Sequence, residues 1–70
     1  MTTKIYDAIC EIEQYKKNRN FFQTYALYSE IVNKTKLNRN DINAVLNELF
    51  KAGFISVGET VNEKYITTET

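Results

Sequence analysis

Residues 37–54 read LNRNDINAVLNELFKAGF, and this stretch carries the signals for both ends of a helix. Asn38 can accept the open N–H groups of a first turn with its side-chain oxygen. Asp41 stands where a capping box places its acid. Gly53 can adopt the left-handed conformation that ends a helix. The stretch therefore predicts a helix over residues 39–52, and the rest of the chain is interpreted around it.

The two faces of this predicted helix differ in composition. At 100° per residue, the apolar face consists of Ile42, Val45, Leu46, Leu49 and Phe50. The opposite face consists of Asn40, Asn43, Ala44, Asn47 and Lys51. Asparagine is a mediocre helix former, but its amide can pair bidentately with adenine in the major groove. The asparagines also have a compositional explanation, because the whole chain is rich in Asn, Lys, Ile and Tyr.

Length and charge set limits on the class of protein. Seventy residues indicate a single domain over residues 1–70, near the lower size limit for an unaided core. The net charge is zero, whereas small nucleic-acid-binding proteins are usually basic. The charge is nevertheless uneven. Residues 14–40 contain six basic residues and one acid, which places positive charge just before the predicted helix and at its start.

Neither an enzyme nor a membrane protein is expected. The chain has no histidine, no glycine-rich phosphate loop and no cluster of metal ligands, so we expect no catalysis, no metal and no cofactor. Cys10 is the only cysteine, which argues mildly for a reducing compartment. Without a signal peptide or a membrane-spanning stretch, the sequence predicts a cytoplasmic protein.

Helix should dominate the part of the chain before residue 37. Apolar residues recur at helical spacing over residues 3–17 and again over residues 24–35, which predicts two helices. Phe21 and Phe22 lie between them and are too apolar for a solvent loop. We expect these two residues to form a core plug or a short strand.

The pattern changes after Gly53. Residues 54–57 and 64–67 are short β-prone runs separated by a polar loop, which predicts a two-stranded hairpin. The three helices should pack around Ile9, Ile12, Leu27, Ile31, Ile42, Leu46 and Leu49. The fold class is therefore mainly α with a small β hairpin.

This order of elements resembles the winged-helix (winged helix-turn-helix) superfamily of bacterial and phage regulators. The stretches that carry the resemblance are Glu30-Ile31-Val32, Lys36-Leu37-Asn38, Leu46-x-x-Leu49-x-x-x-Gly53-x-Ile55 and Tyr65-Ile66-Thr67. The resemblance implies a winged-helix domain whose helix 39–52 is the recognition helix in the major groove of double-stranded DNA.

The resemblance also implies roles for particular residues. By position, the residues that would contact DNA are Lys34, Lys36, Arg39, Asn40, Asn43, Ala44, Asn47 and Lys64. The basic residues before and at the start of the recognition helix would meet phosphates, and the asparagines and Ala44 would face base edges. Thr60 and Asn62 are further candidates on the wing. Glu59 and Glu63 depart from the pattern, because acids near phosphates repel them.

The expected function is that of a small DNA-binding transcriptional regulator that acts as a homodimer. Tyr6 and Cys10, beside the apolar face of the first helix, are candidates for the dimer contact. They could equally close the monomer core. The alternative is a winged-helix module of a phage or plasmid accessory protein that binds a protein partner through its acidic wing. A minor alternative is a domain that binds Z-form nucleic acid, because Ile42-Asn43-x-x-Leu46-x-x-Leu49 resembles the pattern of that subfamily. That subfamily has an aromatic where this chain has Asn47, and prolines in the wing.

Overall fold

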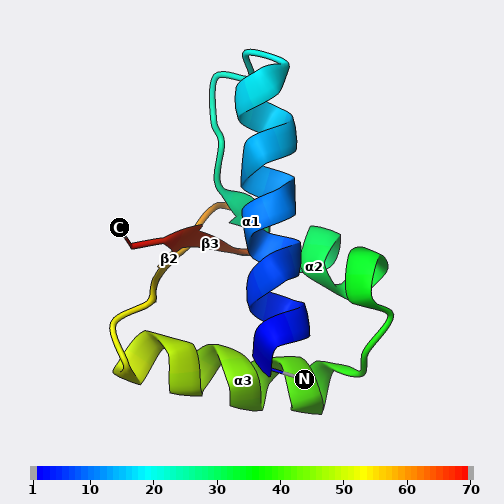
Figure 1. Cartoon of the computed structure of the whole chain (residues 1–70), viewed down its shortest axis with the longest axis vertical. Coiled ribbons are helices and arrows are strands. Elements are labelled where there is room, and N and C mark those ends of the chain that lie inside the picture. The colour runs from blue at the N-terminus through cyan, green and yellow to red at the C-terminus, as the bar shows by residue number, and fades with distance from the viewer. Residues whose placement is uncertain (1, 70) are drawn as a thin grey trace.

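The computed structural model describes residues 2–69 and contains three helices and a three-stranded antiparallel sheet. In chain order the elements are α1 (Thr2–Asn18), β1 (Ala26–Leu27), α2 (Tyr28–Thr35), α3 (Arg39–Lys51), β2 (Ile55–Glu59) and β3 (Lys64–Thr68). Figure 1 shows α1 upright with its first residues above α3, which lies across its foot, while α2 and the sheet lie on either side. The three expected helices and the expected C-terminal hairpin are present, and a third strand accompanies them.

The second helix begins at Tyr28, so its predicted start at residue 24 is wrong. Leu27 has an extended backbone and is the N-cap residue, and its N–H donates to a carboxylate oxygen of Glu30 at 2.9 Å. Glu30 thus satisfies one of the backbone donors that the start of a helix leaves open.

The residues just before α2 form a strand because they have a partner at the other end of the chain. Ala26 pairs with Ile66 and Leu27 with Tyr65, so β3 is the middle strand in the order β1–β3–β2. Ala26 is fully buried at this crossing. Helical periodicity around residue 24 cannot reveal a pairing with a strand forty positions away.

The hairpin contains one glycine that its cross-strand neighbour requires. The predicted strands 54–57 and 64–67 are both present, as β2 and β3, and Gly58 pairs with Tyr65 between them. A Cβ atom on Gly58 would lie 2.2 Å from Cζ of Tyr65, because the ring covers the glycine. The same ring stacks on Tyr25 with the ring centroids 4.3 Å apart, which ties the hairpin to the segment before β1.

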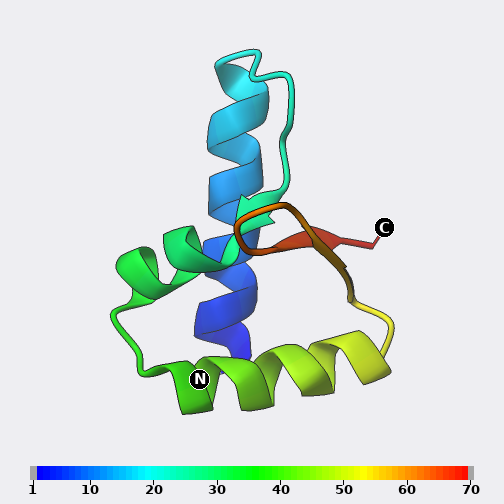
Figure 2. The same cartoon turned by 180° about the vertical axis from the view of Figure 1, so that it is seen from behind.

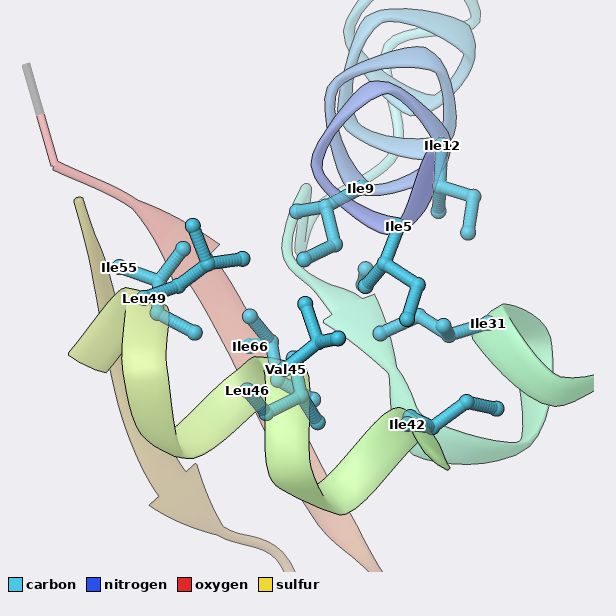
Figure 3. Packing of buried hydrophobic residues seen from close by; sticks show 11 residues of the cluster. Ile5, Ile9, Ile12, Ile31, Ile42, Val45, Leu46, Leu49, Ile55 and Ile66 are labelled. Carbon is cyan, nitrogen blue, oxygen red and sulfur yellow. The ribbon is translucent and has the colours of Figure 1, made fainter. Parts of the chain in front are cut away.

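The core lies where the three helices meet the sheet, and Figure 3 shows its side chains converging from α1, α2, α3, β2 and β3. Its buried members are Ile5, Ile9, Ile12, Ala26, Ile31, Ile42, Val45, Leu46, Leu49, Ile55 and Ile66. Six of the seven predicted core residues are among them. Leu27 is only half-buried, because it ends β1 and caps α2 at the rim of the core. Phe50, expected on the apolar face of its helix, is 54% exposed.

Two charged side chains of α1 are buried and join it to the rest of the fold. The carboxylate of Glu13 accepts hydrogen bonds from the backbone N–H and the hydroxyl of Thr68, at 3.2 and 2.8 Å. The ammonium of Lys16 donates to Glu30 at 2.7 Å and to the carbonyl of Tyr25 at 2.9 Å. Burying charges is tolerated here because each is paired or hydrogen-bonded.

The predicted start of α3 is confirmed, and the helix ends at Lys51, one residue before the predicted end, with Ala52 as its C-cap. Asn38 accepts the N–H of Asp41 at 2.8 Å, and its amide donates back to the Asp41 carboxylate at 2.9 Å. At the other end Gly53 has φ +83°, and the N–H of Phe54 donates to the carbonyl of Leu49 at 3.0 Å. This is the Schellman pattern that ends many helices. The local sequence alone therefore determines where this helix begins and ends.

The prediction that Phe21 and Phe22 form a core plug or a strand is wrong. Phe22 is fully exposed and Phe21 is 48% exposed. Figures 1 and 2 show the reason, because α1 extends well past the sheet and α2, and the chain turns back beside its far end. The ring of Phe21 packs edge-on to that of Tyr15 in α1, with the centroids 6.3 Å apart, and reaches no part of the core.

Candidate nucleic-acid interface

The polar face of α3 is open to solvent, as its sequence predicts. Asn40, Asn43, Ala44 and Asn47 are all exposed, whereas Ile42, Val45, Leu46 and Leu49 on the opposite face are buried. The helix is thus held by its apolar face and presents three amide side chains outward.

A groove of about 390 Å³ runs between this face and the hairpin. It is lined by Tyr28, Asn43, Leu46, Asn47, Phe50, Val57, Lys64 and Ile66. Lys64, the first residue of β3, lies in this groove beside two of the asparagines, so the structure brings it to the surface that the sequence predicts for it. Phe50 and Val57, 54% and 39% exposed, add an apolar wall.

A tyrosine of α2 joins two of the candidate residues. The hydroxyl of Tyr28 donates to Oδ1 of Asn43 at 2.9 Å and lies 3.4 Å from the carbonyl oxygen of Arg39. The guanidinium of Arg39 lies over the Tyr28 ring, 5.6 Å from its centroid. A cation over an aromatic face is attracted by the ring quadrupole. Arg39 and Asn43 are therefore held next to each other at the start of α3.

The candidate lysines near the helix–helix turn occupy different places. Lys34 forms an ion pair with Glu11 of α1 at 3.0 Å, so its charge is directed to that helix. Lys36 is exposed in the turn between α2 and α3, where its φ of +58° ends α2. Lys16, counted with the basic stretch in the sequence, is buried against Glu30. The positive charge available to a ligand is therefore smaller than the sequence suggests.

One acid of the loop between β2 and β3 is already engaged. The carboxylate of Glu63 accepts hydrogen bonds from the backbone N–H of Ser29 at 2.8 Å and from its hydroxyl at 3.1 Å. These bonds, the backbone one first, lower the pKa of Glu63 below its usual range, and Arg39 lowers it further. Glu63 thus fastens the hairpin loop to the start of α2, where the helix dipole favours an anion. Glu59 is exposed at the end of β2.

The loop between β2 and β3 is closed by its own hydrogen bonds. The hydroxyl of Thr60 donates to the carbonyl of Glu63 at 2.7 Å and accepts the N–H of Asn62 at 3.3 Å and that of Glu63 at 3.1 Å. Thr60 is therefore occupied in shaping the loop. Asn62 is exposed and lines a hollow that Arg39 and Lys64 also line.

Sequence reasoning missed the residues that organise this surface. The sequence gives no role to Tyr28, places Phe50 on the apolar face of its helix, and makes Glu63 an acid that would repel phosphates. Their roles depend on which element lies opposite each of them, and spacing along one helix or strand carries no such information. The glutamate two residues into α2, Glu30, was the one local indication that this helix begins near Tyr28.

The candidate dimer residues on α1 make contacts within the chain. Tyr6 is half-buried and packs on the core, with its ring 6.2 Å from that of Phe54. Cys10 is also half-buried, and burial raises the pKa of both side chains. Phe54 is 53% exposed and extends this apolar area at the surface.

Within residues 2–69 no helix is long and apolar enough to cross a bilayer. Over the same range, no group of three His, Cys, Asp or Glu side chains is placed to hold a metal ion.

Comparison of the chain with protein-family models, with curated proteins and with solved structures finds no match.

Proposed function

We propose that the chain is a small double-stranded DNA-binding protein of winged-helix arrangement, in which α3 enters the major groove and the β2–β3 hairpin lies along the backbone. The observation that carries the proposal is the surface that α3 and β3 share. Its members are Arg39, Asn40, Asn43, Ala44, Asn47 and Lys64. Amide side chains can read base edges, and the cations Arg39 and Lys64 can meet phosphates.

The arrangement of elements supports this proposal. Helices α2 and α3 are joined by three residues, 36–38, as in a helix-turn-helix unit. The hairpin follows α3 directly, and Glu63 fastens its loop to the start of α2. That fastening relieves the repulsion expected of an acid in the wing, because the carboxylate is directed to backbone donors. Transcriptional regulation in the cytoplasm is the role that such a module would serve.

A pair of copies would read two half-sites and gain affinity over one 70-residue module. The apolar area around Tyr6 and Phe54 supports a twofold contact through α1. Sedimentation at micromolar concentration, with and without DNA, should give a dimer. A monomer under both conditions would remove this part of the proposal.

The test of DNA binding is a titration with mixed-sequence duplex at two salt concentrations, about 50 and 200 mM. Arg39→Ala and Lys64→Ala should each weaken binding to all sequences and lower the salt slope by about 1. Lys17→Ala is the matched control, since this exposed lysine lies in the last turn of α1, at the end of the molecule away from α3. It should leave the slope unchanged.

A second candidate function is protein binding through the same groove. The exposed side chains of Phe50 and Val57 favour it, because an apolar wall suits a peptide or helix better than phosphates. Zero net charge favours it as well. If wild type binds no duplex even at low salt, this candidate replaces DNA binding.

A further inference from the structure

The hydrogen bond between α2 and α3 fixes which end of one asparagine faces outward. Tyr28 is half-buried and packs on the core, so its hydroxyl has a set position. That hydroxyl lies 2.9 Å from Oδ1 of Asn43 and 3.4 Å from the carbonyl oxygen of Arg39. A tyrosine has a single O–H to donate, and the shorter contact takes it. The oxygen of the Asn43 amide is thus turned toward α2, and its NH₂ group is the end left for a ligand.

This orientation changes what Asn43 can recognise. The bidentate pair with adenine needs the amide oxygen to accept from the base while the amide nitrogen donates to it. With its oxygen held by Tyr28, Asn43 offers two N–H donors. Guanine presents two acceptors in the major groove, and phosphate oxygens are acceptors as well.

The neighbours of Asn43 reinforce this preference. Arg39 and Lys64 line the same hollow and carry donors without acceptors. Glu63 also lines it, but its carboxylate accepts from Ser29 at 2.8 and 3.1 Å. The groups that remain for a ligand at this end of α3 are therefore mostly donors.

We propose that Tyr28 is a positioning residue that makes Asn43 a hydrogen-bond donor, so that this end of α3 selects an acceptor, from a guanine edge or a phosphate, and not adenine. The inference rests on the proposed DNA binding, and it replaces the adenine pairing that the sequence suggests for Asn43.

The first experiment compares two duplexes of equal length and irregular order, one of G·C pairs and one of A·T pairs, by fluorescence anisotropy at low salt. The proteins are wild type, Tyr28→Phe, Asn43→Ala and the double variant. Tyr28→Phe keeps the ring under Arg39 and removes only the hydroxyl. Asn47→Ala is the matched control, one turn further along the same exposed face.

If Asn43 meets guanine, Tyr28→Phe and Asn43→Ala should each weaken the G·C duplex by about fivefold or more and spare the A·T duplex. If it meets a phosphate, both duplexes should weaken alike with the salt slope unchanged, because a neutral amide releases no counterion. In either case the double variant should bind as Asn43→Ala does. The change in duplex affinity caused by Asn47→Ala should be the same in wild type and in Tyr28→Phe. A wild type that prefers the A·T duplex and loses this preference in Asn43→Ala would overturn the proposal.

The second experiment needs no DNA. Side-chain couplings and amide shifts of Asn43 in solution should show one dominant rotamer in wild type and averaging in Tyr28→Phe. Equal averaging in both proteins would overturn the positioning role, whatever binds. A fixed rotamer in a wild type that binds neither duplex at low salt would instead overturn the DNA ligand, and the proposed function with it.

Discussion

Glu30→Ala should be among the most destabilising substitutions at a partly exposed residue of this chain, because the Glu30 side chain makes two stabilising contacts at once. Its carboxylate accepts the N–H of Leu27 at 2.9 Å and the ammonium of Lys16 at 2.7 Å. The Lys16 side chain is only 9% exposed. Without Glu30 its ammonium would lose its counter-charge and keep only the hydrogen bond to the carbonyl of Tyr25. Breaking a buried ion pair from one side costs about 3–5 kcal/mol.

The lower end of that range applies here, since the Glu30 side chain is 36% exposed and water can reach the vacated site. We therefore expect a loss of about 3 kcal/mol, against a total stability of about 4–10 kcal/mol for a chain of this length. In a thermal melt followed by circular dichroism this corresponds to a fall of about 12–24 °C in Tm.

A second variant separates the two tasks of Glu30. In Lys16→Met combined with Glu30→Ala the buried charge is gone, so about 2 kcal/mol of the loss should return. What remains lost is the cap on α2, about 1 kcal/mol. The reasoning is refuted if the double variant melts no higher than Glu30→Ala, or if Glu30→Ala melts within a few degrees of wild type.

Three further outcomes follow from other parts of the structure. Leu46→Ala, at a site 8% exposed, should cost about 2–5 kcal/mol by urea denaturation, and an unchanged midpoint would place Leu46 outside the core. Asn38→Ala should cost about 1 kcal/mol through the lost cap of α3, whereas Asn40→Ala, two residues later on the exposed face, should cost nothing measurable and so checks that the cap is responsible. Because the folded-state pKa of Glu63 is lowered, its link to Ser29 should stabilise the fold above the ordinary glutamate pKa and weaken as pH falls through the lowered value. Amide exchange at Ser29 should show this acid transition in wild type, and its persistence in Glu63→Gln would contradict the assignment.

Where elements begin and end was predictable when the signals were local. Asn38 and Asp41 mark the start of α3 and Gly53 marks its end, all through contacts within a few residues. The two residues of β1 were not predictable, because an extended stretch that short is stable only when a distant strand pairs with it. Helical spacing at residues 24–27 was a local pattern that this tertiary pairing overrode.

The candidate surface was predictable to the same extent. The spacing of Asn40, Asn43 and Asn47 is enough to place them on the exposed side of an amphipathic helix. It cannot show that Lys34 turns to Glu11 on another helix, since that depends on how α1 and α2 cross. The exposure of Phe50 has the same origin, because a position at the edge of an apolar face is buried only if a neighbouring element covers it.

The placement of β3 has a consequence for how this chain folds. It follows both other strands in the chain and is also the middle strand, so β1 and β2 have no strand to pair with until β3 is in place. Ile66, fully buried, is missing from the core until the same moment. Pairings between distant parts of a chain form slowly, because loop closure must precede the contacts that stabilise them. The helices should therefore keep an open apolar face until β3 docks, and the sheet should assemble in one late cooperative step.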